Sequence, residues 1–258
     1  MTEARPGRPK YPAMGIASFR LMRRVLFWTL LPFITPQALW VRKTATRFAD
    51  AAGPTVGSAG SGPTRRLVAV GDSIIAGVGA PTLDQALVGQ TAAALAQRFA
   101  VRVDWWAFGT TGERSAGLVE RQVPALPDLD ADFVIVSMGV NDVTGLSTTR
   151  GYAQNMRLAL DGLRRRYPRA AIAVAGLPPL GVFPLLPQPL RACLGLRASI
   201  LDGVLGKIVA DVVGASFVAV DVDVSPERFS ADGFHPSPSG YREFGESMAA
   251  ALERIAAR

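Results

Sequence analysis

Along residues 65–258, short apolar runs alternate with stretches in which apolar residues recur at helical spacing. The apolar runs, each of which predicts a buried parallel strand, cover residues 67–70, 101–108, 133–138, 170–177 and 217–220. The stretches with helical spacing cover residues 84–99, 148–167, 191–213 and 237–257. Five strands that alternate with helices predict an α/β fold, a three-layer α/β/α sandwich around a five-stranded parallel sheet.

Residues 1–50 depart from this pattern, because they combine one long apolar stretch with many basic residues. The stretch covers residues 25–41, which is at the lower limit for crossing a membrane, and it contains two prolines. We favour a membrane-associating arm, with Trp28 and Trp40 at headgroup level and the basic residues within 20–47 on anionic lipid. Two alternatives stay open: an arm packed on the domain or on a partner subunit, and a cleaved signal peptide.

The net charge of +7 belongs entirely to this leader. Residues 1–50 hold nine Lys and Arg residues against two acidic residues, whereas residues 51–258 hold nineteen of each sign. A neutral domain lacks the basic surface that nucleic-acid binding requires, so we expect no nucleic-acid partner. Residues 51–64 are uncharged and rich in Gly, Ala, Ser and Pro, which predicts a flexible linker before a folded domain at residues 65–258.

The cysteine and histidine content limits the chemistry that the domain can carry. Cys193 is the only cysteine, which excludes an intramolecular disulfide, and His235 is the only histidine. Zinc sites are built from several nitrogen and sulfur ligands, which this chain cannot supply. We therefore expect chemistry without a metal or another cofactor.

Polar residues and glycines stand directly after three of the predicted strands, where sites in parallel sheets lie. Ser73 follows the first strand at the start of a helical turn, where the backbone N–H groups favour developing negative charge. Gly109 and Gly112 follow the second strand and suit a turn that brings a backbone N–H close to a ligand. Asn141 follows the third strand and could donate to an oxyanion. Taken singly, these features could be a helix cap, a surface turn and an Asx turn.

The single histidine lies between the last predicted strand and the terminal helix. Asp232 precedes His235 by three residues, a separation over which a turn can bring the carboxylate to the ring Nδ1 atom. A lone histidine is usually a surface or core residue without chemistry. A carboxylate that orients a histidine base beside a serine is the arrangement of a serine nucleophile site. The sequence thus predicts Ser73 as nucleophile, His235 as base and Asp232 as the orienting carboxylate.

These four segments, in this order, resemble the sequence blocks of the SGNH hydrolase superfamily, also called GDSL lipases and esterases. The resemblance covers roughly residues 65–257, and the blocks read Gly71-Asp72-Ser73, Gly109-x-x-Gly112, Gly139-Val140-Asn141-Asp142 and Asp232-Gly233-Phe234-His235. It implies a flavodoxin-like sheet, the same three catalytic residues, and an oxyanion hole. The oxyanion donors it implies are the backbone N–H groups of Ser73 and Gly112 and the side chain of Asn141.

The blocks depart from the family pattern at a few positions. Ile74 stands where the family's name suggests leucine, and the second block has Ala107 and Glu113-Arg114 where Asn and Asp-Thr are frequent. Gly109 therefore stays open as an alternative oxyanion donor to Gly112. The Gly-x-Ser-x-Gly pattern does not occur in the chain, which argues against an ordinary α/β-hydrolase elbow.

The sequence favours a serine esterase that acts through an acyl-enzyme on Ser73. Residues 178–187 follow the fourth predicted strand and form an apolar, proline-rich loop that suits an acyl chain. With the possible membrane arm, this favours a short-to-medium acyl or lipid-like ester as substrate. A carbohydrate O-acetylesterase is the enzymatic alternative, and a binding or scaffold protein with a vestigial site is the non-enzymatic one.

Overall fold

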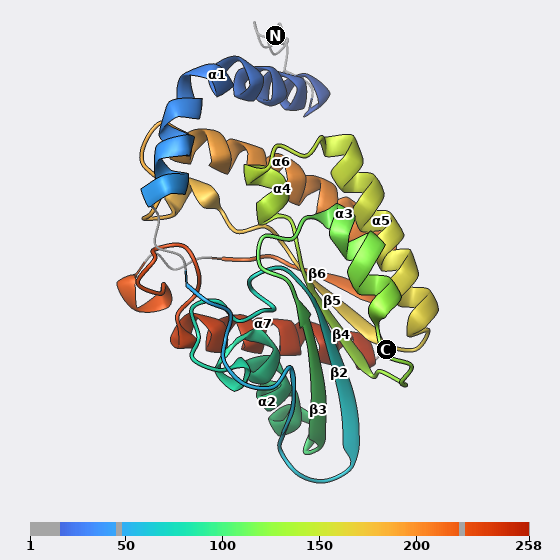
Figure 1. The fold of residues 1–258 in the computed structure, drawn as a ribbon. Coiled ribbons are helices and arrows are strands. Elements are labelled where there is room, and N and C mark those ends of the chain that lie inside the picture. The colour runs from blue at the N-terminus through green and yellow to red at the C-terminus, as the bar shows by residue number, and fades with distance from the viewer. Residues whose placement is uncertain (1–15, 45–47, 222–224, 258) are drawn as a thin grey trace, which may run out of the picture.

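The computed structural model describes residues 16–44, 48–221 and 225–257, and a six-stranded sheet forms its centre (Figure 1). The strands are β1 (Val56–Ala59), β2 (Thr64–Gly71), β3 (Arg102–Gly109), β4 (Phe133–Ser137), β5 (Ala171–Ala175) and β6 (Ala215–Val218). They lie in the order β1-β3-β2-β4-β5-β6, and all pairs from β3 to β6 are parallel. The predicted five-stranded parallel sheet is confirmed. Because β2 lies between β3 and β4, the strand order reverses at β2. Ligand-binding sites of parallel sheets lie at such switch points.

Helices cover both faces of the sheet, as the sandwich prediction requires. The long helices are α2 (Leu87–Phe99), α5 (Thr149–Arg166), α6 (Leu190–Ala210) and α7 (Pro238–Ala256). α2 and α7 pack together on one face, and α5 and α6 on the other. Short segments connect them: η1 (Leu83–Gln85), α3 (Ser115–Gly117), η2 (Leu118–Gln122), η3 (Val123–Ala125), α4 (Val140–Thr144), η4 (Leu180–Val182) and η5 (Pro226–Arg228).

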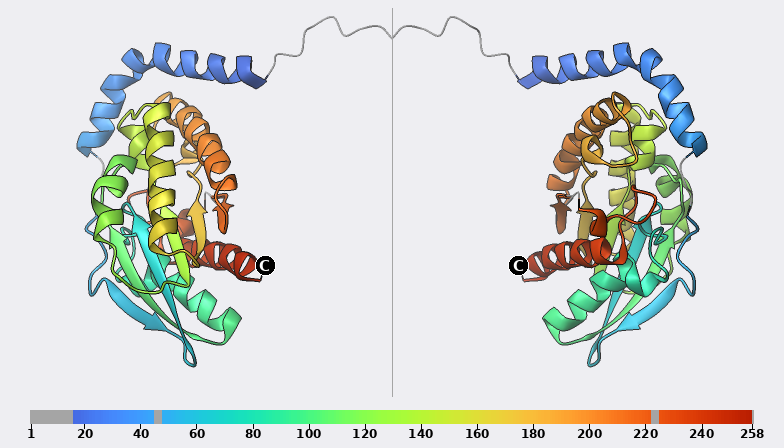
Figure 2. Two further views of the ribbon diagram at one scale, coloured as in Figure 1. Left: turned by 90° about the vertical axis from the view of Figure 1, so that its right-hand side faces the viewer. Right: turned by 90° about the vertical axis from the view of Figure 1, so that its left-hand side faces the viewer.

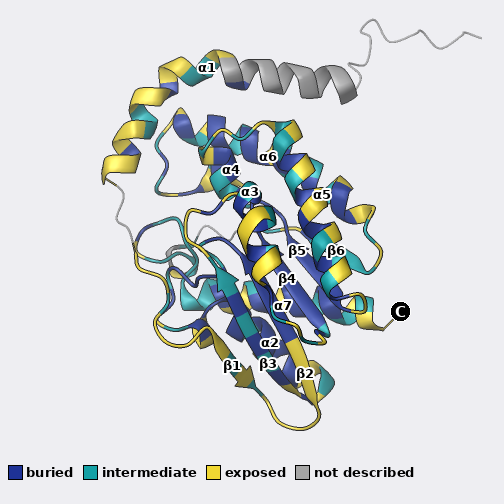
Figure 3. Ribbon diagram, turned by 45° about the vertical axis from the view of Figure 1, so that its right-hand side comes forward, coloured by how far each residue is buried: buried dark blue, intermediate teal, exposed yellow. Residues whose placement is uncertain are grey.

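Burial on both faces of the sheet explains why its central strands contain long apolar runs. Val68 and Val70 of β2 point into the core under α5 and α6, whereas Leu67 and Ala69 point into the core under α2 and α7. A strand that is buried on both faces needs apolar residues without alternation. Figure 3 shows β4 and β5 as buried along most of their length, which fixes their register and the positions of their carboxyl ends.

The segment that we predicted to be a flexible linker, residues 51–64, contains the sixth strand. β1 pairs antiparallel with β3 along the edge of the sheet, and Ala51 donates a backbone hydrogen bond to Ala76. The small residues that suggested flexibility have a packing role instead. A Cβ atom on Gly57 would lie 2.3 Å from the Trp105 ring, so only glycine lets β1 lie flat over this tryptophan. The free edge of β3 supplies the partners that a linker would lack.

Helix α1 (Ile16–Thr44) lies outside the sandwich and packs on α6 (Figure 2). Phe27, Ile34 and Val41, spaced seven residues apart, are buried on its inner face. The helix continues through both of its prolines and bends, as a proline within a helix causes (Figure 1). Within the described ranges, no helix has the length and apolarity needed to cross a membrane.

The inner contacts of α1 match the alternative in which the leader packs on its own domain. The Gln37 side chain donates to the backbone oxygen of Gln188 at 2.8 Å and accepts from the Leu190 N–H at 2.9 Å. The membrane-surface arm stays a prediction. This prediction relies in part on Trp28 and on the basic residues within 20–24, whose side chains are not among those that the structure describes.

Candidate active site

The turn after β2 presents Ser73 at the carboxyl edge of the sheet. At Gly71, a Cβ atom would lie 2.1 Å from the carbonyl oxygen of Ser137 on β4, so no other residue fits at the end of this strand. The backbone N–H groups of Ile75 and Ala76 then donate to the carbonyl of Asp72 at 3.1 and 3.0 Å. The chain therefore turns immediately after the strand, and Ser73 stands at the top of the turn.

The helix-cap explanation does not hold for this segment, because residues 73–79 form turns and no helix begins there. One carboxylate oxygen of Asp72 accepts the Ile74 N–H at 3.2 Å. The Ser73 hydroxyl instead lies 2.9 Å from Nε2 of His235, across 162 residues of sequence. The fold thus brings the serine and the single histidine into hydrogen-bond contact.

His235 is held from its other side by Asp232. Its Nδ1 atom lies 2.6 Å from Oδ2 of Asp232, while Oδ1 of Asp232 accepts the His235 backbone N–H at 2.9 Å. Oδ1 also accepts from the Phe234 N–H and the Ser230 hydroxyl, at 2.8 and 2.7 Å. This tight turn orients the ring so that Nδ1 carries the proton and Nε2 faces Ser73. The predicted Ser73, His235 and Asp232 therefore form one continuous chain of hydrogen bonds.

The charge of Asp232 is stabilised by the same hydrogen bonds. Burial alone would raise the pKa of this carboxyl, but the bonds from the His235 ring and backbone, from Ser230 and from Phe234 offset that effect and lower its pKa to about 2. Asp232 is thus ionised across the neutral range. A fixed negative charge at this position can accept a hydrogen bond from the ring Nδ1 atom.

The loop after β3 separates the roles of the two candidate glycines. Gly109 is the last residue of β3, and a Cβ atom there would lie 2.1 Å from the backbone nitrogen of Ala76. Gly112 lies in the following loop at a φ of +82°, exposed and with open space where a side chain would be. Gly109 therefore has a packing reason to be glycine, whereas Gly112 has a conformational one.

Asn141 is the second residue of the short helix α4 after β4 and faces the turn that holds Ser73. Its side-chain amide lies 3.5 Å from Oδ2 of Asp72, which is buried beneath the site. Burial raises the pKa of Asp72 to about 7, and the nearby Asp142 carboxylate adds to the effect, while the Ile74 N–H and His235 oppose it. Asp142 in turn accepts from the backbone and the hydroxyl of Ser115, at 2.9 and 2.8 Å. A buried polar network therefore lies directly under the site.

Gln122 was missed by the sequence analysis and contacts the strand that leads to Ser73. It ends η2, a five-residue π-helix, and it is buried. Its amide oxygen accepts the Gly71 N–H at 3.0 Å, and its amide nitrogen donates to the Gly71 carbonyl at 2.7 Å. The sequence carried little signal, because Gln122 directly follows two charged residues, Glu120 and Arg121, and resembles a surface position.

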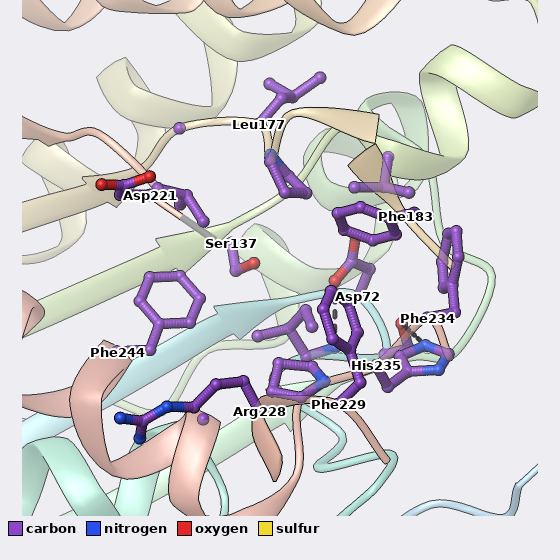
Figure 4. A pocket seen from close by; sticks show the side chains of 18 of the residues that line it. Asp72, Ser137, Leu177, Phe183, Asp221, Arg228, Phe229, Phe234, His235 and Phe244 are labelled. Atoms are coloured by element: carbon purple, nitrogen blue, oxygen red, sulfur yellow. Dashed lines mark hydrogen bonds between the residues drawn. The ribbon is translucent and has the colours of Figure 1, made fainter. Parts of the chain in front are cut away.

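A cavity of about 360 Å³ opens beside Ser73 and His235 (Figure 4). Its walls are mainly apolar, and the side chains that line it include Met138, Leu177, Phe183, Phe229, Phe234 and Phe244. Phe183 comes from the predicted proline-rich loop and makes edge-to-face contacts with Phe229 and Phe234, both at 5.3 Å between ring centres. At the far end, the side chains of Asp221 and Arg228 form a polar rim. No group of three or more potential metal-ligating side chains occurs in the described part of the chain.

The fold and this site define a three-layer α/β/α protein with a Ser-His-Asp constellation at the carboxyl edge of a parallel sheet. Residues 69–243 match the model of the GDSL-like lipase/acylhydrolase family, and the chain belongs to that family. The resemblance predicted from the sequence blocks is thereby confirmed.

The relatives agree with this assignment. A GDSL-like esterase of Mycobacterium tuberculosis is 31% identical over 202 residues, which cover 70% of this chain and 63% of the relative. Among solved structures, a psychrotrophic esterase of Pseudoalteromonas matches with a TM-score of 0.58 and 14% identity, over 75% of this chain and 100% of that one. A family 3 carbohydrate esterase of Clostridium thermocellum matches with a TM-score of 0.57 and 17% identity, over 75% and 98%. At these identities, the two structures support the fold alone.

Proposed function

We propose that the protein is a serine esterase that hydrolyses carboxylic esters through an acyl-enzyme. Ser73 Oγ attacks the ester carbonyl while His235 Nε2 takes its proton, and Asp232 stabilises the imidazolium that forms. The tetrahedral intermediate then expels the alcohol, which His235 protonates. Water, activated by the same histidine, hydrolyses the acyl-enzyme and restores Ser73. The observation that carries this proposal is the 2.9 Å contact between Ser73 and His235, with Asp232 at 2.6 Å on the other ring nitrogen.

Three donors are the best candidates for stabilising the oxyanion of the tetrahedral intermediate. They are the backbone N–H groups of Ser73 and Gly112 and the side-chain amide of Asn141. Gly112 lies in the loop after β3, and the Asn141 amide lies 3.5 Å from Asp72, the residue next to Ser73 in the sequence. Donors fixed in place before the reaction lower the barrier, because they need no reorganisation as the charge develops.

The apolar cavity supports an ester with a short-to-medium acyl chain as substrate. Its aromatic wall, formed by Phe183, Phe229 and Phe234, adjoins His235 and offers few polar groups along its length. A sugar ring carries hydroxyl groups around its edge and would require hydrogen-bond partners there, which this aromatic wall does not offer. Carbohydrate O-acetyl ester hydrolysis remains the second candidate, because a structural neighbour is a carbohydrate esterase.

Hydrolysis of p-nitrophenyl esters from acetate to palmitate, by the wild type and Ser73→Ala, tests both levels of this proposal. We expect turnover in the wild type, none above background in the variant, and an optimum at a chain longer than acetate. Equal turnover in both proteins would contradict the serine mechanism. An optimum at acetate, together with deacetylation of an acetylated sugar, would favour the carbohydrate alternative. A wild type inactive on every ester would support the vestigial site.

We further propose that the outer face of α1 binds an anionic membrane surface. Opposite its buried residues, α1 exposes Phe33, Leu39 and Trp40, at 79%, 56% and 60% of their surface, and exposed Arg42 and Lys43 follow. Aromatic side chains favour the headgroup region, and basic residues favour anionic lipid. The inner face of α1 is hydrogen-bonded to the end of the proline-rich loop, whose Leu185 N–H donates to Gly233 beside the site at 3.3 Å. A lipid surface on α1 would therefore lie close to the site.

Co-sedimentation with phosphatidylglycerol and phosphatidylcholine vesicles tests this surface. We expect the wild type to bind the anionic vesicles and the Phe33→Asp/Trp40→Asp double variant to lose that binding. Val213→Asp is the matched control, because Val213 is 89% exposed beyond the far end of α6. Wild-type binding that is absent, or unchanged in the double variant, would contradict the proposal. A wild-type dimer that only the double variant dissociates would assign the face to a second copy of the chain.

A further inference from the structure

The peptide group at the end of β2 receives an unusual set of hydrogen bonds. The N–H of Gly71 donates to the Gln122 amide oxygen, and its carbonyl accepts both from the Gln122 amide nitrogen and from the backbone N–H of Thr110 at 3.1 Å. The next N–H, that of Asp72, donates to Ser137 on β4 at 3.2 Å. The backbone is therefore fixed on both sides immediately before Ser73.

The Gln122 side chain acts here like a short piece of a neighbouring strand. An amide group offers one acceptor and one donor in fixed geometry, and Gln122 uses both on the N–H and C=O of a single residue. Gln122 is 7% exposed, so water does not readily replace these bonds. The π-helix η2 that carries it departs from ordinary helical geometry at this point, and such segments are frequent at functional sites.

The same carbonyl connects the two loops that supply the proposed oxyanion donors. Thr110, which donates to Gly71, accepts the Glu113 N–H at 3.0 Å and so closes the turn that contains Gly112. Ser73 lies two residues after Gly71. A displacement of the Gly71 peptide would therefore move the nucleophile and the Gly112 turn together.

From this juxtaposition we propose that Gln122 is a positioning residue for catalysis, which holds the Gly71 peptide and thereby aligns Ser73 with Gly112. The inference rests on the proposed serine esterase function. Gln122 does not touch the cavity, so its contribution concerns the geometry of attack and not the binding of the acyl chain. A misplacement of about 1 Å can reduce catalysis by about 10²-fold, which sets the scale of the expected effect.

Steady-state kinetics of Gln122→Ala on the preferred p-nitrophenyl ester test this role. We expect kcat to fall by about 10- to 100-fold while KM changes little, because the cavity walls come from other residues. Gln90→Ala is the matched control, since its amide also bonds a backbone carbonyl, that of Asp84 at 2.8 Å, but Gln90 lies on α2 and bonds neither Gly71 nor a residue that lines the cavity. The control should retain wild-type kcat.

Gln122→Glu adds a readout that a purely structural role would not move, and it keeps the test valid if the alanine variant fails to fold. A protonated glutamic acid has one acceptor and one O–H donor and can restore both bonds, whereas a carboxylate cannot. The ratio of variant to wild-type kcat should therefore rise as pH falls from about 8 to 5.5. A Gln122→Glu variant with wild-type kcat at every pH, while Ser73→Ala is inactive, would overturn the positioning role. Activity retained in Ser73→Ala would instead overturn the esterase mechanism itself.

Discussion

At the scale of single residues, Asp72 is buried, and its burial disfavours the charged form of its carboxyl group. Its pKa of about 7 in the folded protein exceeds the value of about 3.9 expected for an unfolded chain. The folded state therefore binds more protons than the unfolded state between these pH values, and stability falls as pH rises through this window. The cumulative loss is on the order of 4 kcal/mol.

An Asp72→Asn variant should lack this pH dependence, because an amide of the same shape has no proton to lose. We expect the difference in unfolding free energy between the variant and the wild type to shift in favour of the variant from pH 5 to pH 8. Urea denaturation at several pH values measures it. Curves that stay parallel over this range would show that Asp72 is already ionised at pH 5.

Asn141 is the residue whose role depends most on the chemistry proposed for the site. Removing one oxyanion donor costs roughly 10²–10³-fold in kcat, because the charge develops only in the transition state. Asn141→Ala should therefore lose kcat by that factor, with KM nearly unchanged, in steady-state assays on the preferred ester. A variant that keeps wild-type kcat would remove Asn141 from the oxyanion hole.

At the scale of elements, β1 shows why small residues misled the sequence analysis. A run of Gly, Ala and Ser has the composition of a linker, but here the small side chains permit close packing on Trp105.

Gly57→Val should destabilise the protein by about 1–3 kcal/mol, since the new side chain overlaps the tryptophan ring. Urea denaturation gives the value. Ser58→Val, on the exposed face of the same strand, is the control and should stay within about 0.5 kcal/mol. Equal, negligible effects of both changes would restore the flexible linker.

The elements that were predicted correctly are those that leave a recognisable pattern within their own stretch of sequence. The central strands β4 and β5 are apolar runs buried at every position, so composition alone reveals them. The constellation could be predicted because Ser73 directly follows the first parallel strand, while Asp232 and His235 lie three residues apart just before the terminal helix. By contrast, the pairing of β1, the course of α1 through its prolines and the Gln122 contact depend on partners far away in sequence. Their residues carry no local signature of those partners.

At the scale of the whole molecule, the site is formed by two parts: the carboxyl edge of the sheet, and the proline-rich loop with α1 above it. The sheet and the turns at its carboxyl edge hold the reacting groups, and the bonds from Gln122 and Asp232 fix their orientation. The proline-rich loop and α1 lie over this edge and are hydrogen-bonded to each other through Gln37. We infer that the sheet edge carries out the catalytic steps, whereas the proline-rich loop and α1 determine which ester and which membrane surface are bound.

The central claim is that Ser73 is an activated nucleophile, and covalent labelling tests it most directly. A p-nitrophenyl alkylphosphonate transfers its phosphonyl group only to a serine whose hydroxyl is activated by a base. Intact-protein and peptide mass spectrometry should find one phosphonyl group, on Ser73, in the wild type. Ser73→Ala and His235→Ala should remain unlabelled over the same period. Absence of label in a folded wild type, or label on another residue, would contradict the account.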